Sequence, residues 1–305
     1  MPKIFVVGSY NTGLTIRVPR MPVLGESLAG DSFDMGPGGK GSNQAIGAAR
    51  LGADVRLLVC LGDDIFAENA LQLYRREGIG AELVHQIAGA SSGIGFVNIV
   101  PSGENWITVD LGANLLMTPQ HVRDCAAEIS DCDMLMTQLE IPPETAAAAL
   151  RLGKENGAIT ILNPAPAQPI EKDYLADVDI LTPNASEARI LLGLPPEDPS
   201  PPHELAKRLL DMGAGRVVVT LGEDGALIVD GEETTRVPAI SIRAVDVTGA
   251  GDSFNAALAV SLSEGLSLKE SVQFAVRAGA YTALHLGVID GLPTRADLEE
   301  LGLVG

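Results

Sequence analysis

Short apolar runs alternate with longer amphipathic stretches along most of the chain. The apolar runs are rich in Val, Ile and Leu and end at Gly, Asn or Pro, which is typical of buried strands; they cover 4–7, 55–61, 134–139, 159–162, 179–181 and 216–220. The amphipathic stretches carry apolar residues on one helical face and predict helices; they cover 45–51, 65–77, 143–156, 185–192, 202–212, 254–262, 267–285 and 295–301. Repeated strand–helix units predict an α/β fold of three layers, α/β/α, with a mainly parallel central sheet.

Strict alternation of apolar and polar residues marks a second group of short strands. They cover 14–18, 27–33, 93–100 and 106–110, and the turn 101–104 joins the last two into a hairpin. We expect them to form a separate small β-sheet, a lid made by about 11–34 and 91–112, on a single domain that spans 1–305. A late β segment is predicted at 226–229 and 234–242.

Polar residues follow several of the predicted core strands. They are Asn11, Glu140, Asn163, Asn184, Thr220 and Asp252. In parallel sheets, ligands bind at the carboxyl ends of the strands. One shared cleft could therefore hold all of these side chains.

The stretch 245–255, Val-Asp-Val-Thr-Gly-Ala-Gly-Asp-Ser-Phe-Asn, joins an extended segment to a helix. Its glycines allow close approach of a ligand, and the free N–H groups of the first helical turn favour an anion. A carboxylate at that point, Asp252, suits a base that takes a proton from a hydroxyl attacking a phosphate. The structural alternative is a tight loop in which Asp252 caps the helix.

Composition narrows the class of protein. The chain has 305 residues, 46% of them hydrophobic, and a formal net charge of −19, which argues against a broad nucleic-acid surface. The three cysteines, Cys60, Cys125 and Cys132, have no metal-ligand spacing, and an odd number favours a reducing compartment. The first residues read as a buried strand and not as a signal or membrane segment. We therefore expect a cytoplasmic protein with no membrane partner.

Five motifs in order along the chain resemble those of the PfkB carbohydrate kinase family, most of all its ribokinase members. They are Gly-Gly-Lys-Gly-Ser-Asn-Gln-Ala at 38–45, Gln-Leu-Glu at 138–140, Asn-Pro-Ala-Pro-Ala at 163–167, Thr-Pro-Asn-Ala-Ser-Glu at 182–187 and Asp-Val-Thr-Gly-Ala-Gly-Asp at 246–252. The resemblance covers essentially the whole chain. It implies a ribokinase-like fold and transfer of the γ-phosphoryl group of ATP to a hydroxymethyl group of a small sugar, with ribose as the leading candidate.

The resemblance also implies roles for single residues. Asp252 would be the base, and the anion hole would consist of Gly249, Ala250 and Gly251. The sugar would contact Asn11, Gly39, Lys40, Asn43 and Glu140. The nucleotide and Mg²⁺ side would be formed by Asn184, Glu187, Thr220 and Gly222. A monovalent cation, K⁺, would be held by Asp246 and the carbonyl of Thr248. An exposed lid edge would pair two chains into a homodimer.

Two positions depart from the family pattern. Gly13 stands where the family carries an Asp that grips sugar hydroxyls, with Ser9 and Thr12 as the nearby hydroxyls that could compensate. Gly291 stands where a Ser is expected, so a side-chain oxygen is lost from the cation loop. The first departure keeps other sugars open as substrates, and the second puts dependence on K⁺ in question.

Other interpretations remain open at this point. One is a nucleoside kinase or another sugar kinase of the same family, and another is a sugar-binding sensor without catalysis. A nucleotide-dependent dehydrogenase is excluded because no Gly-x-Gly-x-x-Gly follows the first strand. Several residues also have plain structural interpretations: Lys40 as a solvated lysine, Glu187 as an exposed helix carboxylate, Asn163 in a turn, Asp246 bracing its loop and Trp106 packed in the small sheet.

Overall fold

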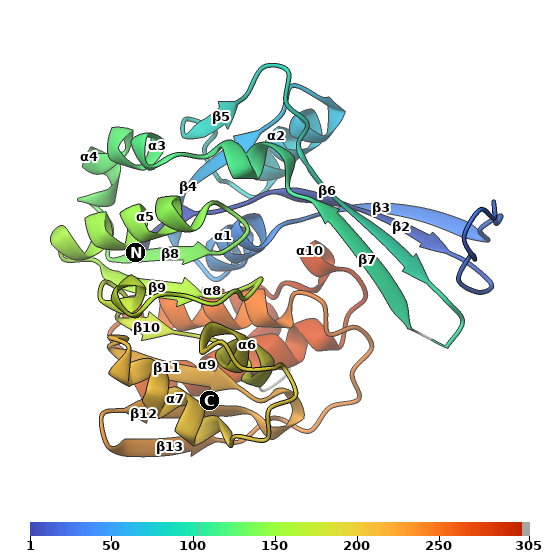
Figure 1. Cartoon of the computed structure of the whole chain (residues 1–305). Helices are drawn as coiled ribbons and strands as arrows, with labels where there is room; N and C mark the ends of the chain where they lie inside the picture. The colour runs from blue at the N-terminus through green and yellow to red at the C-terminus, as the bar shows by residue number, and fades with distance from the viewer. Residues whose placement is uncertain (103, 301–305) are drawn as a thin grey trace.

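A nine-stranded and a four-stranded sheet organise the part of the chain that the computed structural model describes, residues 1–102 and 104–300 (Figure 1). The larger sheet contains β1 (Lys3–Val7), β4 (Asp54–Leu61), β5 (Val84–Gln86), β8 (Met134–Gln138), β9 (Ile159–Asn163), β10 (Ile180–Leu181), β11 (Arg216–Thr220), β12 (Ala226–Asp230) and β13 (Glu233–Val237). The smaller sheet contains β2 (Asn11–Arg17), β3 (Ser32–Gly38), β6 (Gly93–Ile99) and β7 (Asn105–Asp110). The helices are α1 (Lys40–Arg50), α2 (Ile65–Arg76), α3 (Pro119–Asp124), α4 (Ala126–Ile129), α5 (Pro143–Glu155), α6 (Ala185–Leu191), α7 (Pro202–Asp211), α8 (Ala250–Ser263), α9 (Leu268–Ala283), α10 (Val288–Gly291) and α11 (Arg295–Glu300), with 3₁₀ turns at Gly112–Leu116, Lys172–Leu175 and Gly222–Asp224.

The larger sheet is mainly parallel, as predicted. Its strand order is β13-β12-β11-β10-β9-β8-β1-β4-β5, and all pairs from β11 to β5 are parallel. Only β12 and β13 run antiparallel at one edge. The carboxyl ends of β1, β8, β9 and β11 therefore share one side of the sheet.

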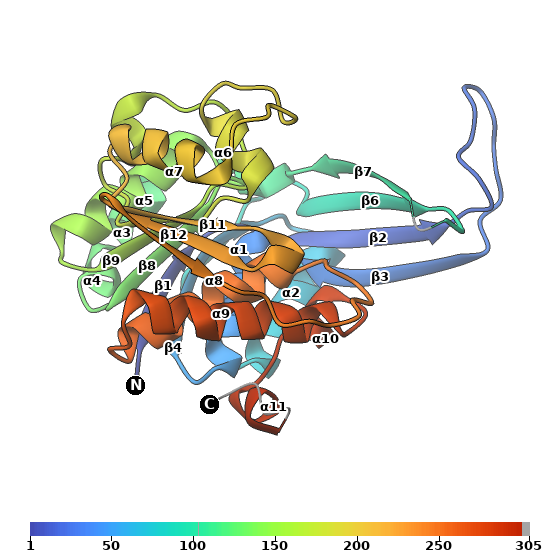
Figure 2. The ribbon, with the colours of Figure 1, turned by 90° about the horizontal axis from the view of Figure 1, so that it is seen from below.

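Helices cover both faces of this sheet and give the three layers (Figure 2). Buried residues of α1, α2, α8 and α9 form one apolar core, and those of α3 to α7 form the other. Successive residues of β1 alternate between the two: Ile4 and Val6 enter the first core, Phe5 and Val7 the second. A strand buried on both faces explains the continuous apolar runs in the sequence.

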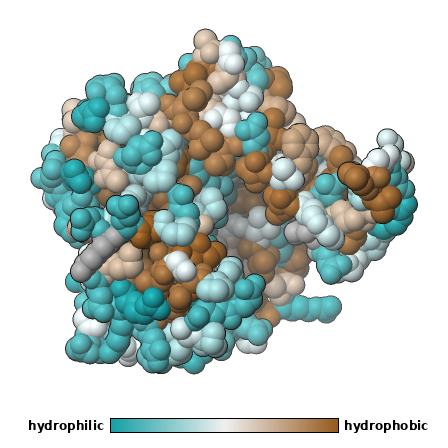
Figure 3. Space-filling view, viewed as in Figure 1, coloured by the Kyte–Doolittle hydropathy of each residue, from teal (hydrophilic) through white to brown (hydrophobic). Residues whose placement is uncertain are grey.

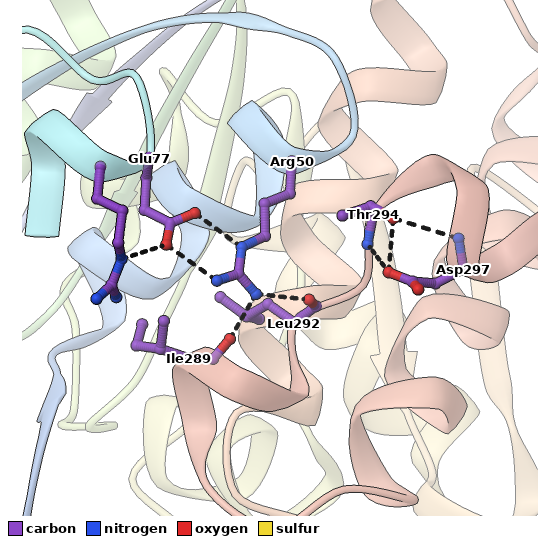
Figure 4. A network of polar contacts seen from close by, with 7 residues as sticks. Arg50, Glu77, Ile289, Leu292, Thr294 and Asp297 are labelled. Carbon is purple, nitrogen blue, oxygen red and sulfur yellow. Dashed lines mark hydrogen bonds and ion pairs between the residues drawn. The ribbon is translucent and has the colours of Figure 1, made fainter.

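Helix α1 is held at its carboxyl end by Arg50 (Figure 4). The Arg50 guanidinium binds both carboxylate oxygens of Glu77, at 2.8 and 3.0 Å, and donates to the carbonyl oxygens of Ile289 and Leu292 at 2.6 and 2.8 Å. Arg50 holds the pKa of Glu77 below its ordinary value. Arg50 therefore ties α1 to α10 and the loop after it.

The smaller sheet, of order β3-β2-β6-β7, projects from the body (Figure 1). One predicted strand was misplaced: the chain is not in a strand from 27 to 31, and β3 continues through Pro37 and Gly38. Pairing with β2 fixes this register, with Asn11 opposite Gly38. Pro37 is tolerated because β3 is an edge strand, where an N–H is not required.

The register gives the smaller sheet two chemically different faces. Asn11 and Gly13 alternate with Leu14 and Ile16 along β2, so the two pairs lie on opposite faces. The face of Leu14 and Ile16, here called the outer face, also carries Phe33, Met35, Phe96 and Trp106. These side chains are largely exposed, and apolar residues gather along the projecting sheet in Figure 3. The prediction that Trp106 packs inside the sheet is wrong, because 56% of it is exposed.

Some further boundaries differ from prediction. β13 ends at Val237, because its partner β12 begins at Ala226 and leaves 238–242 unpaired. The helix expected from 254 begins at Ala250, since its first turn carries glycines. Strand β5 and helices α3 and α4 were not predicted because they are short. Two predictions lie partly outside the described residues: Gly103 in the turn 101–104, and Leu301 at the end of the last helix. Among residues 1–102 and 104–300, we find no helix with the length and apolar character that a membrane span requires.

Candidate active site

Helix α8 begins at a glycine that no other residue could replace without strain. Gly249, the N-cap, has φ of 81°, and a Cβ there would come within 2.7 Å of Val288 Cγ1. The Ala250 N–H donates to the carbonyl of Val247 at 3.2 Å. The N–H groups of Gly249, Gly251 and Asp252 find no acceptor among residues 1–102 and 104–300. These groups lie at the positive end of a 14-residue helix, where an anion is favoured, and make up a candidate anion site.

Asp252 lies in the first turn of α8, with 6% of its surface exposed. Its carboxylate does not cap the helix, so that structural alternative is wrong. It accepts instead from two side-chain amides of α1: Asn43 Nδ2 at 2.8 Å and Gln44 Nε2 at 3.0 Å. Both oxygens of the carboxylate are thereby oriented beside the anion site.

Helix α1 also starts at a glycine whose conformation only glycine adopts freely. Gly39 has φ of 92°, and a Cβ there would lie 2.6 Å from the Asn11 backbone nitrogen. The next N–H, of Lys40, donates to Glu140 Oε2 at 2.8 Å, and Ser9 Oγ donates to the same oxygen. The start of α1 is thus joined to the segments that follow β1 and β8.

Three carboxylates act on the positive charge of one half-buried lysine, Lys40. Burial alone lowers the pKa of Lys40, but Asp252, Glu140 and Glu187 together outweigh it and raise that pKa. Burial raises the pKa of Glu140 and of Glu187, because Lys40 compensates each of them only in part. The lysine is therefore no solvated surface residue. Negative charge exceeds positive charge at this site, which favours an additional cation when an anion binds.

Asn11 is oriented by a residue that the sequence did not single out. Asn114 binds the backbone of Tyr10 on both sides, accepting from its N–H at 2.9 Å and donating to its carbonyl at 2.8 Å. It also donates to Asn11 Oδ1 at 3.0 Å. The amide NH₂ of Asn11 is left to donate to a ligand, while buried Asn43 Oδ1 has no partner among the described residues and is left to accept.

Neither of the hydroxyls near Gly13 replaces the missing Asp. Ser9 is fully buried and is bound to Glu140 and to the Gly41 N–H. Thr12 is 2% exposed and donates to the Tyr10 hydroxyl at 3.1 Å. The gap at Gly13 is open, since a Cβ there would meet only the Gly36 carbonyl at 3.6 Å.

Asn184 and Glu187 form a capping box at the start of α6. Asn184 Oδ1 accepts from the Glu187 N–H and Glu187 Oε2 accepts from the Asn184 N–H, both at 2.8 Å. Glu187 is half-buried and acts electrostatically on Lys40, so it is not simply an exposed carboxylate. Asn184 also pairs with Thr220 in an isolated β-bridge, two residues before exposed Gly222. All four predicted nucleotide-side residues therefore lie together.

Asp246 braces the loop before α8. Its two oxygens accept from the N–H groups of Thr248 at 2.9 Å and Gly287 at 3.3 Å. Burial opposes these bonds, but they hold the pKa of Asp246 below its ordinary value. Gly291 is buried, and a Cβ there would lie 3.3 Å from the Thr282 carbonyl, so this packing leaves little room for a serine. Within the described chain, no cluster of three or more His, Cys, Asp or Glu could hold a metal.

Two residues that the sequence analysis did not single out, Gln44 and Gln138, belong to the hydrogen-bond network of Asp252. Gln44 binds Asp252 and also donates to Asn163 Oδ1 at 3.1 Å, while Gln138 binds Gln44. Asn163, for which a turn was one interpretation, accepts from the Ala165 N–H at 2.8 Å through its backbone, and its side chain is also part of this buried network. Gln44 and Gln138 lie inside the two motifs at 38–45 and 138–140, which was the only signal for them.

A buried carboxylate beside the free N–H groups of a helix start, with a lysine at the start of a second glycine-led helix, is the arrangement expected of a phosphotransferase that acts on a hydroxyl group. That the acceptor is a carbohydrate is indicated by comparison with known sequences. The chain belongs to the pfkB family of carbohydrate kinases, whose model matches residues 1–295.

Known proteins resemble the chain over nearly its full length. It is 34% identical to the ribokinase of Haemophilus influenzae, over 97% of this chain and 96% of that protein. It is 33% identical to the deoxyribokinase of Salmonella typhi, over 97% of each. The structure of Arabidopsis thaliana ribokinase complexed with ribose and ATP superimposes with a TM-score of 0.90 at 28% identity, covering 98% of both chains. The ribokinase-like fold is thereby confirmed.

Proposed function

We propose that this protein transfers the γ-phosphoryl group of ATP to the hydroxymethyl oxygen of ribose and forms ribose 5-phosphate and ADP. The observation that supports this most is the buried Asp252 carboxylate, held by two amides beside the free N–H groups of α8. ATP as donor and ribose as acceptor are supported by the relatives named ribokinase and by the complex with ribose and ATP.

In the proposed reaction, the acceptor hydroxyl gives its proton to Asp252. The hydroxyl oxygen bonds to the γ-phosphorus, the bond from that phosphorus to the bridging oxygen breaks, and ADP leaves. A carboxylate is a weak base at neutral pH, so its main effect is to orient the hydroxyl and accept the proton late. The anion hole assigned to Gly249, Ala250 and Gly251 stabilises the transferred group mainly through the free N–H groups of Gly249 and Gly251.

The sugar side of the proposal comprises Asn11, Gly39, Lys40, Asn43 and Glu140. The free NH₂ of Asn11 donates to a sugar hydroxyl, and the unpartnered Asn43 Oδ1 accepts from one. Gly39 lets the start of α1 approach the sugar closely. The four-stranded sheet acts as a lid whose Asn11 face closes on the sugar and excludes water.

The nucleotide side of the proposal comprises Asn184, Glu187, Thr220 and Gly222. Mg²⁺ accompanies ATP here, supported by the excess of carboxylate charge around Lys40. Glu187 Oε1 is free of the capping box and would hold it through water, and the ion would neutralise phosphate charge. K⁺ would lie by Asp246 and the Thr248 carbonyl. Both Asp246 oxygens already accept N–H groups, so we expect any K⁺ effect to be weak.

The test is ATP turnover against ribose, 2-deoxyribose, other sugars and nucleosides, with Mg²⁺ and K⁺ present. Highest kcat/KM with ribose supports the proposal. A higher value with another acceptor would replace ribose but leave Asp252 as base. Binding of ATP and sugar without turnover would favour the sensor.

A second candidate substrate is a sugar with fewer hydroxyls, such as deoxyribose. The open gap at Gly13 favours it, and so does the deoxyribokinase relative. We expect Gly13→Asp to raise kcat/KM for ribose about 10-fold or more, the effect of one hydrogen bond to a charged group. Initial rates at varied ribose concentration measure it.

The matched control for this change is Gly95→Asp. Gly95 lies opposite Gly13 on β6, on the same face, and has open space for a Cβ. It adds the same charge one strand further along and should leave ribose kinetics near those of the parent. If both variants change kcat/KM for ribose equally, the effect comes from the added charge alone. If Gly13→Asp gives no gain, the missing carboxylate at Gly13 does not limit the reaction with ribose.

We also propose that two chains pair through the lid, with its exposed edge bringing the chains together and the outer face of the small sheet packing between them. Exposed Phe33, Phe96 and Trp106 make the outer face apolar, and water contact with such a patch is unfavourable.

We propose a cytoplasmic location for the protein. The free thiols of Cys60 and Cys125 support a reducing compartment.

Phe96→Asp is expected to disrupt this dimer. Phe96 stands in the middle of the outer face and is 50% exposed, so a carboxylate there would be buried on pairing. The dimer dissociation constant should rise about 30-fold or more, measured by sedimentation velocity over a dilution series. Ile107→Asp is the control, because Ile107 is similarly exposed but lies on the opposite face. A parent chain that is monomeric throughout would contradict the pairing.

A further inference from the structure

The Asp252 carboxylate stands at the end of a chain of buried side-chain amides. Gln138 Nε2 donates to Gln44 Oε1 at 2.6 Å, and Gln44 Nε2 donates to Asp252 Oδ1 at 3.0 Å. Gln44 is fully buried and Gln138 is 1% exposed. The chain therefore runs through the interior, behind the face of Asp252 that a substrate would meet.

The direction of this chain is set by Asp252. A carboxylate only accepts hydrogen bonds, so Gln44 must turn its NH₂ toward it and its oxygen away. That oxygen then accepts from Gln138, and neither amide can be reversed without losing its partner. Asn163 fits the same order, since its oxygen accepts from Gln44 and its NH₂ donates to the Thr182 carbonyl at 3.3 Å.

The two amides that bind Asp252 differ in their second group. Asn43 keeps an oxygen without a partner, which suits contact with a ligand. Gln44 has both of its polar atoms engaged inside the protein and has none to offer a substrate. A residue of this kind acts on the reaction only through Asp252.

We propose that Gln44 is a positioning residue for Asp252: its bond to Oδ1 fixes the plane of the carboxylate, and Gln138 fixes Gln44. This inference rests on the proposed function, in which Asp252 accepts the proton of the sugar hydroxyl. With one oxygen held by Asn43 and the other by Gln44, the carboxylate cannot rotate. Its remaining lone pairs therefore point in a constant direction toward the acceptor hydroxyl.

The test compares Gln44→Met, which has a similar volume and no donor, with the parent chain. We expect kcat to fall about 10- to 100-fold, the loss of one charge-assisted bond in the transition state, while KM for the sugar changes little. A defect in folding would instead lower kcat and raise KM together, so the split between kcat and KM is the diagnostic readout.

A measurement without substrate separates this inference from the proposed function. Crystal structures of the parent and of Gln44→Met compare the orientation of the Asp252 carboxylate. A carboxylate that is rotated or disordered in the variant supports the positioning role even if no sugar is turned over. An unmoved carboxylate with kcat within about 2-fold of the parent overturns it.

Two further variants guard against misfolding. Gln138→Met leaves the donor to Asp252 in place and removes only its support, so a smaller fall in kcat in the same direction is expected. Gln44→Glu keeps the shape but replaces the donor to Asp252 with a second carboxylate, so the Asp252 carboxylate should turn away from it and kcat should fall. If Gln44→Met does not fold, these two variants decide: an unmoved Asp252 carboxylate and parent-like kcat in both would overturn the proposal.

Discussion

We expect Asp252→Asn to lower kcat by about 10²- to 10⁴-fold, the usual contribution of a positioned base. An amide cannot take the proton of the attacking hydroxyl. It also sets an NH₂ group against Asn43 or Gln44, both of which donate to this position. ATP binding should stay near that of the parent, since the N–H groups of the first turn of α8 remain. Coupled detection of ADP and calorimetric titration with ATP measure the two quantities.

Ser253→Ala is the matched control for this variant. Ser253 is the next residue of α8, is equally buried, and its Oγ has no partner among the described residues. Its removal should leave kcat near that of the parent. If Asp252→Asn keeps more than a tenth of the parent rate, Asp252 is not the base.

The second large effect is expected at Gly39. Gly39→Ala would force a Cβ to within 2.6 to 2.9 Å of the backbone of Tyr10 and Asn11, in addition to the strain of a positive φ. Because these atoms belong to the proposed sugar side, we expect kcat/KM for the sugar to fall about 100-fold or more, as misplacement of a binding element by about 1 Å does.

Gly52→Ala separates strain from collision. Gly52 follows α1 with φ of 95°, close to that of Gly39, but a Cβ there meets nothing within 4 Å. Both variants should lose about 1 to 3 kcal/mol of unfolding free energy to backbone strain, measured by urea denaturation. Only Gly39→Ala should lower kcat/KM for the sugar. If Gly39→Ala and Gly52→Ala lower it equally, the collision of the added Cβ at Gly39 has no effect of its own.

Most of the fold could be predicted because its signals are local. The apolar runs of β1 and β8 and the amphipathic stretch of α5 carry the parallel sheet and its covering helices. The strand β3 could not be placed, because Gly36-Pro37-Gly38 looks like a loop and becomes a strand only by pairing with β2. In that case tertiary pairing overrides local propensity.

The site was predictable where backbone chemistry decides and not where side-chain orientation decides. Gly39 and Gly249 are visible in sequence as glycine-rich helix starts, and the structure gives both a positive φ. The hydrogen bonds of Gln44, Gln138 and Asn114 depend on which way a buried amide turns, and no periodic pattern records that. The exposure of Trp106 could not be predicted either. Alternation shows that a strand has two faces, but it does not show which face packs against the rest of the protein.

The Arg50 contacts have a mechanical consequence for the enzyme. Helix α1 starts at the proposed sugar side and ends at Arg50, which donates to the carbonyls of Ile289 and Leu292. Val288, the residue before Ile289, lies against Gly249 at the start of α8. These contacts connect the start of α8 to the helix that carries the proposed sugar side, so we expect these two parts to keep their spacing. A closing motion of the proposed lid would then move the projecting sheet over a site whose reacting groups stay in place.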